Sequence, residues 1–528
     1  MRSVSLVFSL FALSLVAKAQ DDKLDQDMLS KIKAEGMNNS KVMDYAFYLT
    51  DANGPRLNNS TGYMKAANWA KAELTKIGLK NAAVEPWGEW GKSWDLEKSY
   101  VALTAPYYRP INAFPKSFCV GTNGLKNAEV IMLTAKDSVE LMAFKGKLKG
   151  KVVVMPQHDT LKQTFTADAS RYTAEDLKKM GDYDPKAIPE RTRQGFPAGG
   201  RRPFGAPGAM SAQGIRAFLQ QEGAIAILST TTRNHDGTLF VQGGGAYAKG
   251  TPENFLDVVL GIEDYNSIQR LLEHKIPVKL DMDVKTKFSS ADTKGYNVIA
   301  ELPGTDKSLK EQLVMIGGHL DSWHGGTGAT DNAAGCAVMM EVMRILKATG
   351  VNPRRTIRVA LWGGEESGLN GSRNYVKNHF TDTVARRFNK EGDKVSVYFN
   401  LDNGTGKVRG IYTQGNEAIK PIFAQWIKQF EDLGATTVTM QNTGGTDHQS
   451  FDAIGLPGFQ FIQDGIEYNT RTHHSNVDTY DHLIPADLTQ AATVIAAFVY
   501  NASQRDEKMP RKPAPAAPAG SQAPVTRN

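Results

Sequence analysis

The chain contains little cysteine, little excess charge and a single long apolar run. Its 528 residues include only two cysteines, Cys119 and Cys336, which excludes a disulfide-rich scaffold and a cysteine-rich metal site. We expect both to be buried free thiols, because Cys336 lies in an apolar, helix-forming stretch; one disulfide between them is the alternative. The 62 basic and 56 acidic residues nearly cancel, giving a net charge of +6, so the composition predicts no nucleic-acid partner.

The one long apolar run lies at the N-terminus. Residues 4–16 follow Arg2 and precede the small-residue site Ala17-Lys18-Ala19. This order is typical of a secretory signal that is cut after Ala19. A membrane anchor is the alternative, but the run is too short to span a bilayer. We therefore predict that residues 1–19 are a signal peptide, that the protein is secreted or periplasmic, and that it has no membrane contact once the signal is removed.

The length predicts more than one domain, and the texture of the sequence divides it. Residues 125–290 read as a β-rich insert, with short buried strands and a loop-rich stretch. Residues 20–124 and 291–503 then form the two parts of one host domain. Residues 504–528 are rich in proline and alanine and have little to bury, so we expect a disordered tail.

The second part of the host domain alternates apolar strands with amphipathic helices. The runs LVMIGG, TIRVALW and VSVYFNLD are separated by helical patterns. This alternation predicts an α/β fold, in which a mostly parallel sheet carries helices on both faces. Ligands in such folds bind at the carboxyl ends of the strands.

Side chains that bind metals follow these apolar runs. Two histidines and three carboxylates are the ligands that a pair of zinc ions requires, and a further carboxylate can serve as a base. A single histidine after a strand is usually a structural polar group, and acidic doublets are common on helix surfaces. The conjunction of all of them at strand ends favours a metal site over these structural interpretations. The residues are His319, Asp331, Glu365, Glu366, Asp402 and His474.

The roles follow from chemistry. Asp331 lies in a glycine-rich turn that enters a helix, whose N-terminus favours negative charge, and we predict that it bridges two Zn²⁺ ions. His319 and Asp402 would complete one ion. Glu366 and His474 would complete the other. Metal-bound histidines commonly donate their second nitrogen to a carboxylate, so we expect Asp321 to hold His319 and Asp478 to hold His474.

These motifs resemble the zinc exopeptidases typified by aminopeptidase Y, bacterial leucyl aminopeptidases and plasma glutamate carboxypeptidase (carboxypeptidase Q). The resemblance covers most of residues 40–500. It implies the zinc exopeptidase fold, phosphorylase/hydrolase-like, with an inserted protease-associated domain. It further implies that Glu365 is the general base and that the bond between Asp331 and Asn332 is cis. It rests on GPRL at 54–57, on GGHLDSW, and on Asp331-Asn332, Glu365-Glu366, Asp402 and His474 in the family's order.

The resemblance also separates the two adjacent histidines. The family's ligand lies four residues before an acidic position, and Asp478 lies four residues after His474. His473 then falls where relatives place a group that polarises the scissile carbonyl, although a plain surface histidine is an equal alternative. The run TDHQSF resembles a family loop beside the substrate, so Asp447 and His448 are possible substrate contacts. The arginine-rich loop 190–204 could reach the same cleft, but solvated charges are the simpler interpretation.

The sequence therefore predicts a secreted di-zinc metalloexopeptidase, an aminopeptidase or dipeptidase, that acts on peptide substrates. A water bridging the two ions would attack the peptide carbonyl, with Glu365 as general base. Two alternatives stay open: a glutaminyl cyclase-type transferase with one zinc, and a non-catalytic peptidase-like binding module. Zinc content and chelator-sensitive hydrolysis separate the three.

Overall fold

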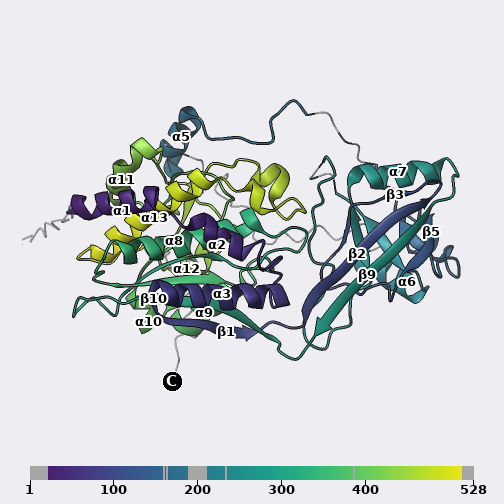
Figure 1. The fold of residues 1–528 in the computed structure, drawn as a ribbon, viewed down its shortest axis with the longest axis horizontal. Helices are drawn as coiled ribbons and strands as arrows, with labels where there is room; N and C mark the ends of the chain where they lie inside the picture. Colours follow the sequence, from purple (N-terminus) through teal and green to yellow (C-terminus); the bar gives the residue numbers. More distant parts are fainter. Residues whose placement is uncertain are drawn as a thin grey trace, which may run out of the picture.

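The computed structural model contains two eight-stranded sheets, each with its own helices (Figure 1). The predicted signal peptide and the arginine-rich loop lie outside the residues that the structure describes. Those residues are 22–158, 161, 164–187, 211–231, 233, 235–383 and 387–513.

The first sheet carries the strands of the predicted host domain. Its four central strands, β12, β11, β15 and β18, run parallel to one another, and the pairs outside them are mostly antiparallel. Their carboxyl ends therefore meet along one edge, as expected for an α/β fold. In spatial order the strands are β1 (Lys80–Glu89), β10 (Lys294–Leu302), β12 (Thr356–Trp362), β11 (Leu313–His319), β15 (Val395–Asn400), β18 (Gly458–Gln463), β16 (Val408–Tyr412) and β17 (Thr437–Thr439).

Helices cover both faces of this sheet because alternate strand residues point to opposite faces. On β11, Val314 and Ile316 pack in one core and Met315 packs in another. The larger core is covered by α1 (Gln26–Asn38), α2 (Val42–Leu49), α3 (Thr61–Ile77), α8 (Ala334–Ala348), α11 (Lys420–Ile427) and α13 (Pro485–Gln504). The smaller core is covered by α9 (Asn370–Phe380) and α12 (His448–Asp452), beside α10 (Lys390–Lys394) and the hairpin of β13 (Thr381–Asp382) and β14 (Arg387–Phe388).

The second sheet forms a separate core at the other end of the molecule (Figure 1). In spatial order its strands are β3 (Arg109–Pro110), β2 (Ser93–Ala105), β9 (Lys279–Ser289), β5 (Lys126–Met132), β6 (Val152–Val154), β7 (Ala226–Ser229), β8 (Asp257–Leu260) and β4 (Ala113–Pro115). Its helices are α4 (Ser138–Met142), α6 (Ala212–Gln221) and α7 (Ile262–Glu273).

This sheet begins earlier than the predicted boundary at residue 125. The long strand β2 pairs with β9 from Ser93 onward, so residues 93–124 belong to the insert rather than to the host. The pairing joins segments almost 200 residues apart, and nothing local in the sequence reveals it.

One helix of the predicted insert belongs structurally to the host domain. Helix α5 (Ala174–Gly181) packs on the host domain beside β17. The salt bridges of Arg171 with Asp464 and Asp487 hold the segment before α5 on the host domain.

The predicted disordered tail also needs correction. After α13, the chain continues along the host domain, where Met509 is 2% exposed and its N–H donates to Ser396 of β15. Arg511 lies over the ring of Phe388. The segment 505–513 therefore packs on the host domain through Met509 and Arg511, because these two residues interrupt the proline-rich composition. The tail beyond residue 513 lies outside the described residues.

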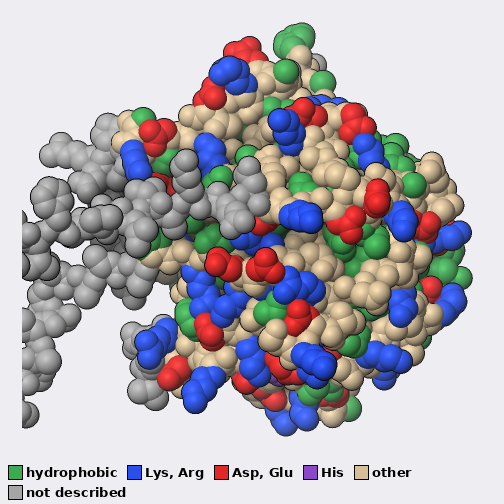
Figure 2. Space-filling model, turned by 90° about the vertical axis from the view of Figure 1, so that its left-hand side faces the viewer, with side chains coloured by type: hydrophobic (Ala, Val, Ile, Leu, Met, Phe, Trp, Pro, Cys, Tyr) green, Lys and Arg blue, Asp and Glu red, His purple; other side chains and the backbone are tan. Residues whose placement is uncertain are grey.

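The two thiols and the distribution of surface charge can be compared with the sequence. Cys119 and Cys336 are free and buried, as predicted. Within the part of the chain that the structure describes, no helix combines the length and apolarity needed to cross a membrane. Figure 2 shows basic and acidic side chains interspersed over one face of the molecule, in line with the nearly balanced composition.

Candidate metal centre

The predicted ligands gather at the carboxyl edge of the first sheet. His319 is the last residue of β11, Glu365 and Glu366 follow β12, and Asp402 follows β15. Since β12, β11 and β15 are adjacent and parallel, these three strand ends lie side by side. Local strand patterns therefore brought these four residues together, as the α/β interpretation predicts.

Asp331 lies at the centre of the cluster, in the kinked turn η3 (Ala329–Ala333) that enters α8. Its Oδ1 is 3.1 Å from Nε2 of His319, which is in turn 3.4 Å from Oδ1 of Asp402. Its Oδ2 is 3.2 Å from Nε2 of His474, which is 2.8 Å from Oε2 of Glu366. The two carboxylate oxygens of one aspartate thus face two different pairs of side chains. The Asp331–Asn332 bond is cis, as the resemblance implied.

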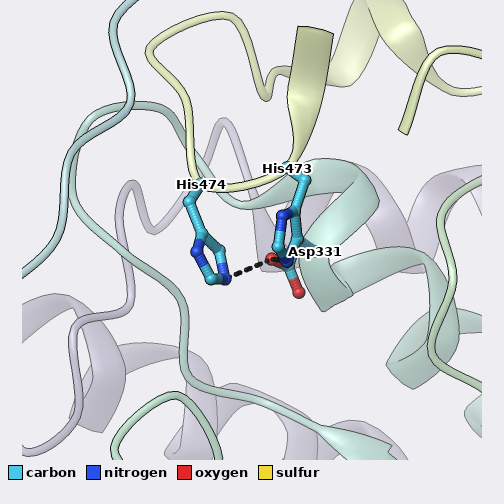
Figure 3. Close-up of side chains that lie close together, drawn as sticks. All are labelled: Asp331, His473 and His474. Atoms are coloured by element: carbon cyan, nitrogen blue, oxygen red, sulfur yellow. Dashed lines mark ion pairs between the residues drawn. The ribbon is translucent and has the colours of Figure 1, made fainter. Parts of the chain in front are cut away.

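The two histidines stand next to each other over Asp331. Figure 3 shows both rings reaching toward its carboxylate from the loop above it. The rings of His473 and His474 are stacked, with centroids 3.7 Å apart. Nε2 of His473 is 3.8 Å from Oδ2 of Asp331, so geometry alone also allows His473 as a partner for a cation there.

Asp478 does not hold His474, which differs from our expectation. Its carboxylate accepts the backbone N–H groups of Thr330 and Asp331, at 2.6 and 3.1 Å. It thereby fixes the turn that presents Asp331. The spacing that placed Asp478 near the site was informative, but the acidic group positions a backbone rather than an imidazole. Burial, with repulsion from Asp331, raises the pKa of Asp478 to about 7.

Asp321 contacts His319, as predicted, and also the turn that carries the two glutamates. Its backbone carbonyl lies 2.9 Å from Nδ1 of His319, closer than its carboxylate at 3.6 Å. Its carboxylate accepts the N–H groups of Glu365 and Glu366, at 3.1 and 3.3 Å. One residue thus orients the ring of His319 and the turn that carries both glutamates.

The electrostatics of the cluster are those of a site built for positive charge. Burial opposes the charged form of His474, but Glu366 and Asp331 outweigh it and raise its pKa to about 10. Burial raises the pKa of Glu366 to about 7, and the nearby Asp331 adds to this rise. For Asp331, burial favours the neutral acid, yet hydrogen bonds from His319 and His474 hold its pKa well below the usual range. In this arrangement the histidines supply the countercharge that a metal would otherwise give.

Glu365 is held apart from these pairs. It is 9% exposed, and burial raises the pKa of its carboxyl well above the usual range, against the attraction of His319. It lines the same cavity as the cluster. A carboxylate in this position, with an elevated pKa and no ligand role, is suited to take up and release a proton.

The residues fit zinc. Three buried carboxylate oxygens of the cluster lack a well-aligned hydrogen bond among the described residues: Oε1 of Glu366, and Oδ2 of Asp331 and Oδ1 of Asp402, which only lie near a histidine Nε2 atom. Unpaired buried carboxylate oxygens are costly unless a cation satisfies them. Imidazole nitrogen with carboxylate oxygen is a donor set that zinc accepts.

Two residues of the insert reach this site, and the sequence did not reveal them. Nε2 of Gln242 is 2.9 Å from Nδ1 of His474. The guanidinium of Arg233 contacts Nδ1 of His473. Both follow β7 in an irregular segment without a recognisable motif, so only the fold brings them to the metal cluster.

Arg56 supports the site from the opposite side. It is fully buried and donates to the carbonyls of Leu320, Thr327 and Gly328, and to that of Leu49. The first three carbonyls lie between His319 and Asp331, whereas Leu49 is the last residue of α2. The GPRL motif contains this arginine, so the sequence signal was present, but its structural role was not predicted.

A cavity of about 480 Å³ opens onto the cluster. Its wall includes Gly445, Thr446 and Gln449, neighbours of the predicted substrate contacts. Asp447 and His448 themselves are fully buried and do not line it, which corrects that expectation. The chain enters α12 here and turns both side chains inward. His448 contacts Gln414, and its burial lowers its pKa to about 4.

The fold and the cluster indicate a class: α/β proteins with metal-binding types of side chain at the carboxyl edge of a sheet. Comparison with known proteins shows which family this part of the chain resembles. Residues 297–499 match the model of peptidase family M28. This segment contains all of the predicted metal ligands, so the site-bearing part of the chain is similar to the peptidases of this family.

Relatives extend the similarity over most of the chain. Human carboxypeptidase Q is 27% identical over 467 residues, which is 88% of this chain and 85% of the relative. Aminopeptidase YwaD of Bacillus subtilis is 30% identical over 209 residues, 38% of this chain and 44% of the relative. Among solved structures, a peptidase M28 precursor from Shewanella amazonensis superposes with a TM-score of 0.64 at 25% identity, covering 92% of this chain and 99% of that one. A zinc aminopeptidase from Bacillus subtilis shares the fold, with a TM-score of 0.55 at 20% identity over 89% and 96%.

Proposed function

We propose that the protein is a secreted exopeptidase that uses two zinc ions and cleaves peptide bonds near a free terminus. The observation that carries this proposal is the position of Asp331, whose Oδ1 faces His319 and whose Oδ2 faces His474. His319 with Asp402 would hold one ion, and His474 with Glu366 the other. Asp331 would belong to both.

The ions, when bound, would polarise the peptide carbonyl and make a coordinated water acidic enough to react near neutral pH. Glu365 removes the proton of the attacking water and delivers it to the leaving amine. His473 lines the cavity beside the cluster and donates a hydrogen bond to the carbonyl oxygen as negative charge develops there. Asp321 keeps Glu365 in reach, because its carboxylate holds the backbone N–H of that residue.

The substrate is a peptide with an accessible end. The named relatives are carboxypeptidases Q and aminopeptidases, which favours a terminal bond over an internal one. Arg373 is an exposed arginine in the cavity wall and offers a positive group to a free carboxylate. A free dipeptide would place its terminal carboxylate near Arg373 within this cavity. We also propose that residues 1–19 direct secretion and that the insert is a protease-associated domain.

The general base is tested by Glu365→Gln. The amide cannot accept the proton, so kcat should fall by roughly 10²–10⁴-fold while zinc content stays that of the wild type. Glu311→Gln, at an exposed glutamate before β11, is the matched control and should leave both values unchanged. Wild-type turnover in Glu365→Gln would refute the role of Glu365.

The reaction class is tested by zinc content and a substrate panel. Two zinc ions per chain agree with the proposal, whereas one would favour a glutaminyl cyclase-type transferase. Free dipeptides, N-blocked peptides and C-amidated peptides should be assayed with and without chelator. Hydrolysis that survives N-blocking and C-amidation together would contradict an exopeptidase. No chelator-sensitive hydrolysis of any of them would favour a binding module.

A further inference from the structure

The insert forms a short backbone ladder with the loop that carries the two histidines. The N–H of Val241 donates to the carbonyl of His474 at 2.9 Å, and the N–H of Asn476 donates to the carbonyl of Leu239 at 3.2 Å. The side chain of Asn476 also accepts the N–H of Leu239, at 2.6 Å. His474 has a φ of 59°, which is uncommon for a residue other than glycine, and this ladder holds it there. The insert therefore fixes the backbone of the predicted ligand.

Gln242, next to this ladder, also fixes the ring of His474. Nε2 of His474 faces Glu366 and Asp331, so it is the nitrogen that would bind a metal and must keep its lone pair free. The proton of the neutral ring is then on Nδ1, which donates. The amide of Gln242 lies within hydrogen-bond distance of Nδ1, at 2.9 Å. A half-turn of the amide places its oxygen there as the acceptor, since the two ends of a glutamine amide are almost equal in shape.

Arg233 imposes the opposite state on His473. A guanidinium has no acceptor, so the contact between Arg233 and Nδ1 of His473 requires that this nitrogen accepts. The proton of the neutral ring is then on Nε2, which lies 3.8 Å from Oδ2 of Asp331 on the cavity side. Stacking of Arg233 on the ring of Phe240, at 4.4 Å, holds the guanidinium in place. A nitrogen that carries a proton cannot bind a metal, but it can donate to a substrate oxygen.

We propose that the insert assigns complementary tasks to the two adjacent histidines. Gln242 is a positioning residue that presents His474 as a metal ligand, and Arg233 is a positioning residue that keeps His473 as a hydrogen-bond donor. This inference rests on the proposed function, because it gives each ring its role at the zinc site. It also explains how a sequence with two neighbouring histidines avoids binding the metal through the wrong one.

The role of Gln242 is tested by zinc affinity, measured by competition with a chelator. Gln242→Leu removes the acceptor and should weaken zinc binding by about 10–100-fold. Gln242→Glu keeps an acceptor and should restore affinity to near that of the wild type, a rescue that a purely structural role would not give. Gln220→Leu, an exposed glutamine of α6 in the same domain, is the matched control. Wild-type affinity in Gln242→Leu, or equal weakness in Gln242→Glu, would overturn the proposal.

The role of Arg233 is tested by separating turnover from metal binding. Arg233→Met should leave zinc affinity unchanged and lower kcat roughly 10-fold with little change in KM, because the donor acts mainly on the developing charge. Arg233→Lys, which can still donate to Nδ1, should recover part of the loss. Arg270→Met, at an exposed position of α7, is the control. A loss of zinc in Arg233→Met, or wild-type kcat, would contradict the assignment.

The two proposals fail in different ways. If the wild-type protein binds no zinc, the proposed function and this inference both fall. If the wild type binds two zinc ions and hydrolyses peptides, but Gln242→Leu and Arg233→Met behave like it, only the inference falls.

Discussion

The two eight-stranded sheets contribute to the site in different ways. The first sheet supplies every predicted ligand and the proposed general base, from the ends of parallel strands and the loops beside them. Among the described residues, the domain of the second sheet supplies no carboxylate to the cluster. The residues that follow its strand β7 contact the Nδ1 atoms of the two histidines and pair with the backbone of their loop.

The first sheet therefore determines whether a metal can bind, and the second sheet adjusts the orientation of the two histidines. The positions of the ligands follow from the order of the strands in the first sheet, and that order depends on the alternation of apolar strands and amphipathic helices along the sequence. Contacts from the second sheet depend on a single ladder and a few side chains. Changes in the first sheet should therefore abolish metal binding or stability, whereas changes in the insert should tune affinity and turnover. Four predictions test this contrast in the order of the expected effect.

The strongest test compares Asp331→Asn with Asp402→Asn. If Asp331 belongs to both ions, its substitution should reduce zinc from two to none or one weakly held ion and lower activity by roughly 10³-fold or more. Asp402→Asn should cost mainly the ion next to His319. Zinc content by elemental analysis measures both. Equal loss of a single zinc in the two variants would mean that Asp331 is not shared.

The second test concerns the support of the same edge. Arg56→Met leaves the carbonyls of Leu320, Thr327 and Gly328 without their donor in a buried place. We expect the free energy of unfolding to fall by about 3 kcal/mol, measured by denaturant titration. Arg387→Met, at an exposed arginine of β14, should change it little. A stable Arg56→Met protein with full zinc would show that the loops hold their shape without this arginine.

The third test addresses the boundary between the two sheets, where Nε2 of His324 donates to the carbonyl of Pro115 at 2.7 Å. Burial lowers the pKa of His324 to about 4, so the ring is neutral in the folded protein near neutral pH. As the pH falls below about 6.5, His324 becomes protonated in the unfolded chain, whereas in the folded chain it stays neutral until about pH 4. The contribution of the neutral His324 to the free energy of unfolding is therefore fully present above pH 6.5. It decreases by about 3 kcal/mol as the pH falls to 4.

His324→Gln keeps a donor but cannot titrate. Its free energy of unfolding should decline less than that of the wild type between pH 6.5 and pH 4, by about the same amount. His274→Gln, at an exposed histidine after α7, should follow the wild-type curve. Parallel curves for His324→Gln and the wild type would show that this histidine does not couple protonation to folding.

The smallest effect is expected at the end of the chain. Met509 is buried against β15, the strand that precedes Asp402, whereas Met142 of α4 in the insert is 52% exposed. Met509→Ala should lower the free energy of unfolding by about 2 kcal/mol, and Met142→Ala by much less. Thermal or denaturant unfolding of the two variants gives the comparison. A neutral Met509→Ala would return residues 505–513 to the disordered tail that composition suggested.

The same contrast decides what the sequence could predict. His319, Glu366 and Asp402 were predictable because His319 ends an apolar strand and the other two lie shortly after one, and neighbouring parallel strands place their ends together. Residues 93–124 were assigned to the wrong domain because the pairing of β2 with β9 is not local. The role of Asp478 was also not readable, since an acidic residue at the right spacing can hold either a ring or a backbone.

The contacts that the insert makes with the two histidines could not be predicted from any local sequence pattern. Gln242 and Arg233 lie in an irregular segment whose residue types are common on surfaces. Their meaning comes from a ladder with residues more than 230 positions away. Arg56 is intermediate, because its motif was noticed but the four carbonyls that it serves come from three separate segments.

We propose that Asp331, in the turn before α8, is shared by two zinc ions at the ends of the parallel strands. Anomalous diffraction at the zinc edge from crystals of the zinc-loaded protein tests it most directly. If Asp331 is shared, two peaks should appear roughly 3.5–4 Å apart, one beside each carboxylate oxygen of Asp331, with His474 rather than His473 bound to the second. A single peak, or two peaks that do not share Asp331, would contradict it.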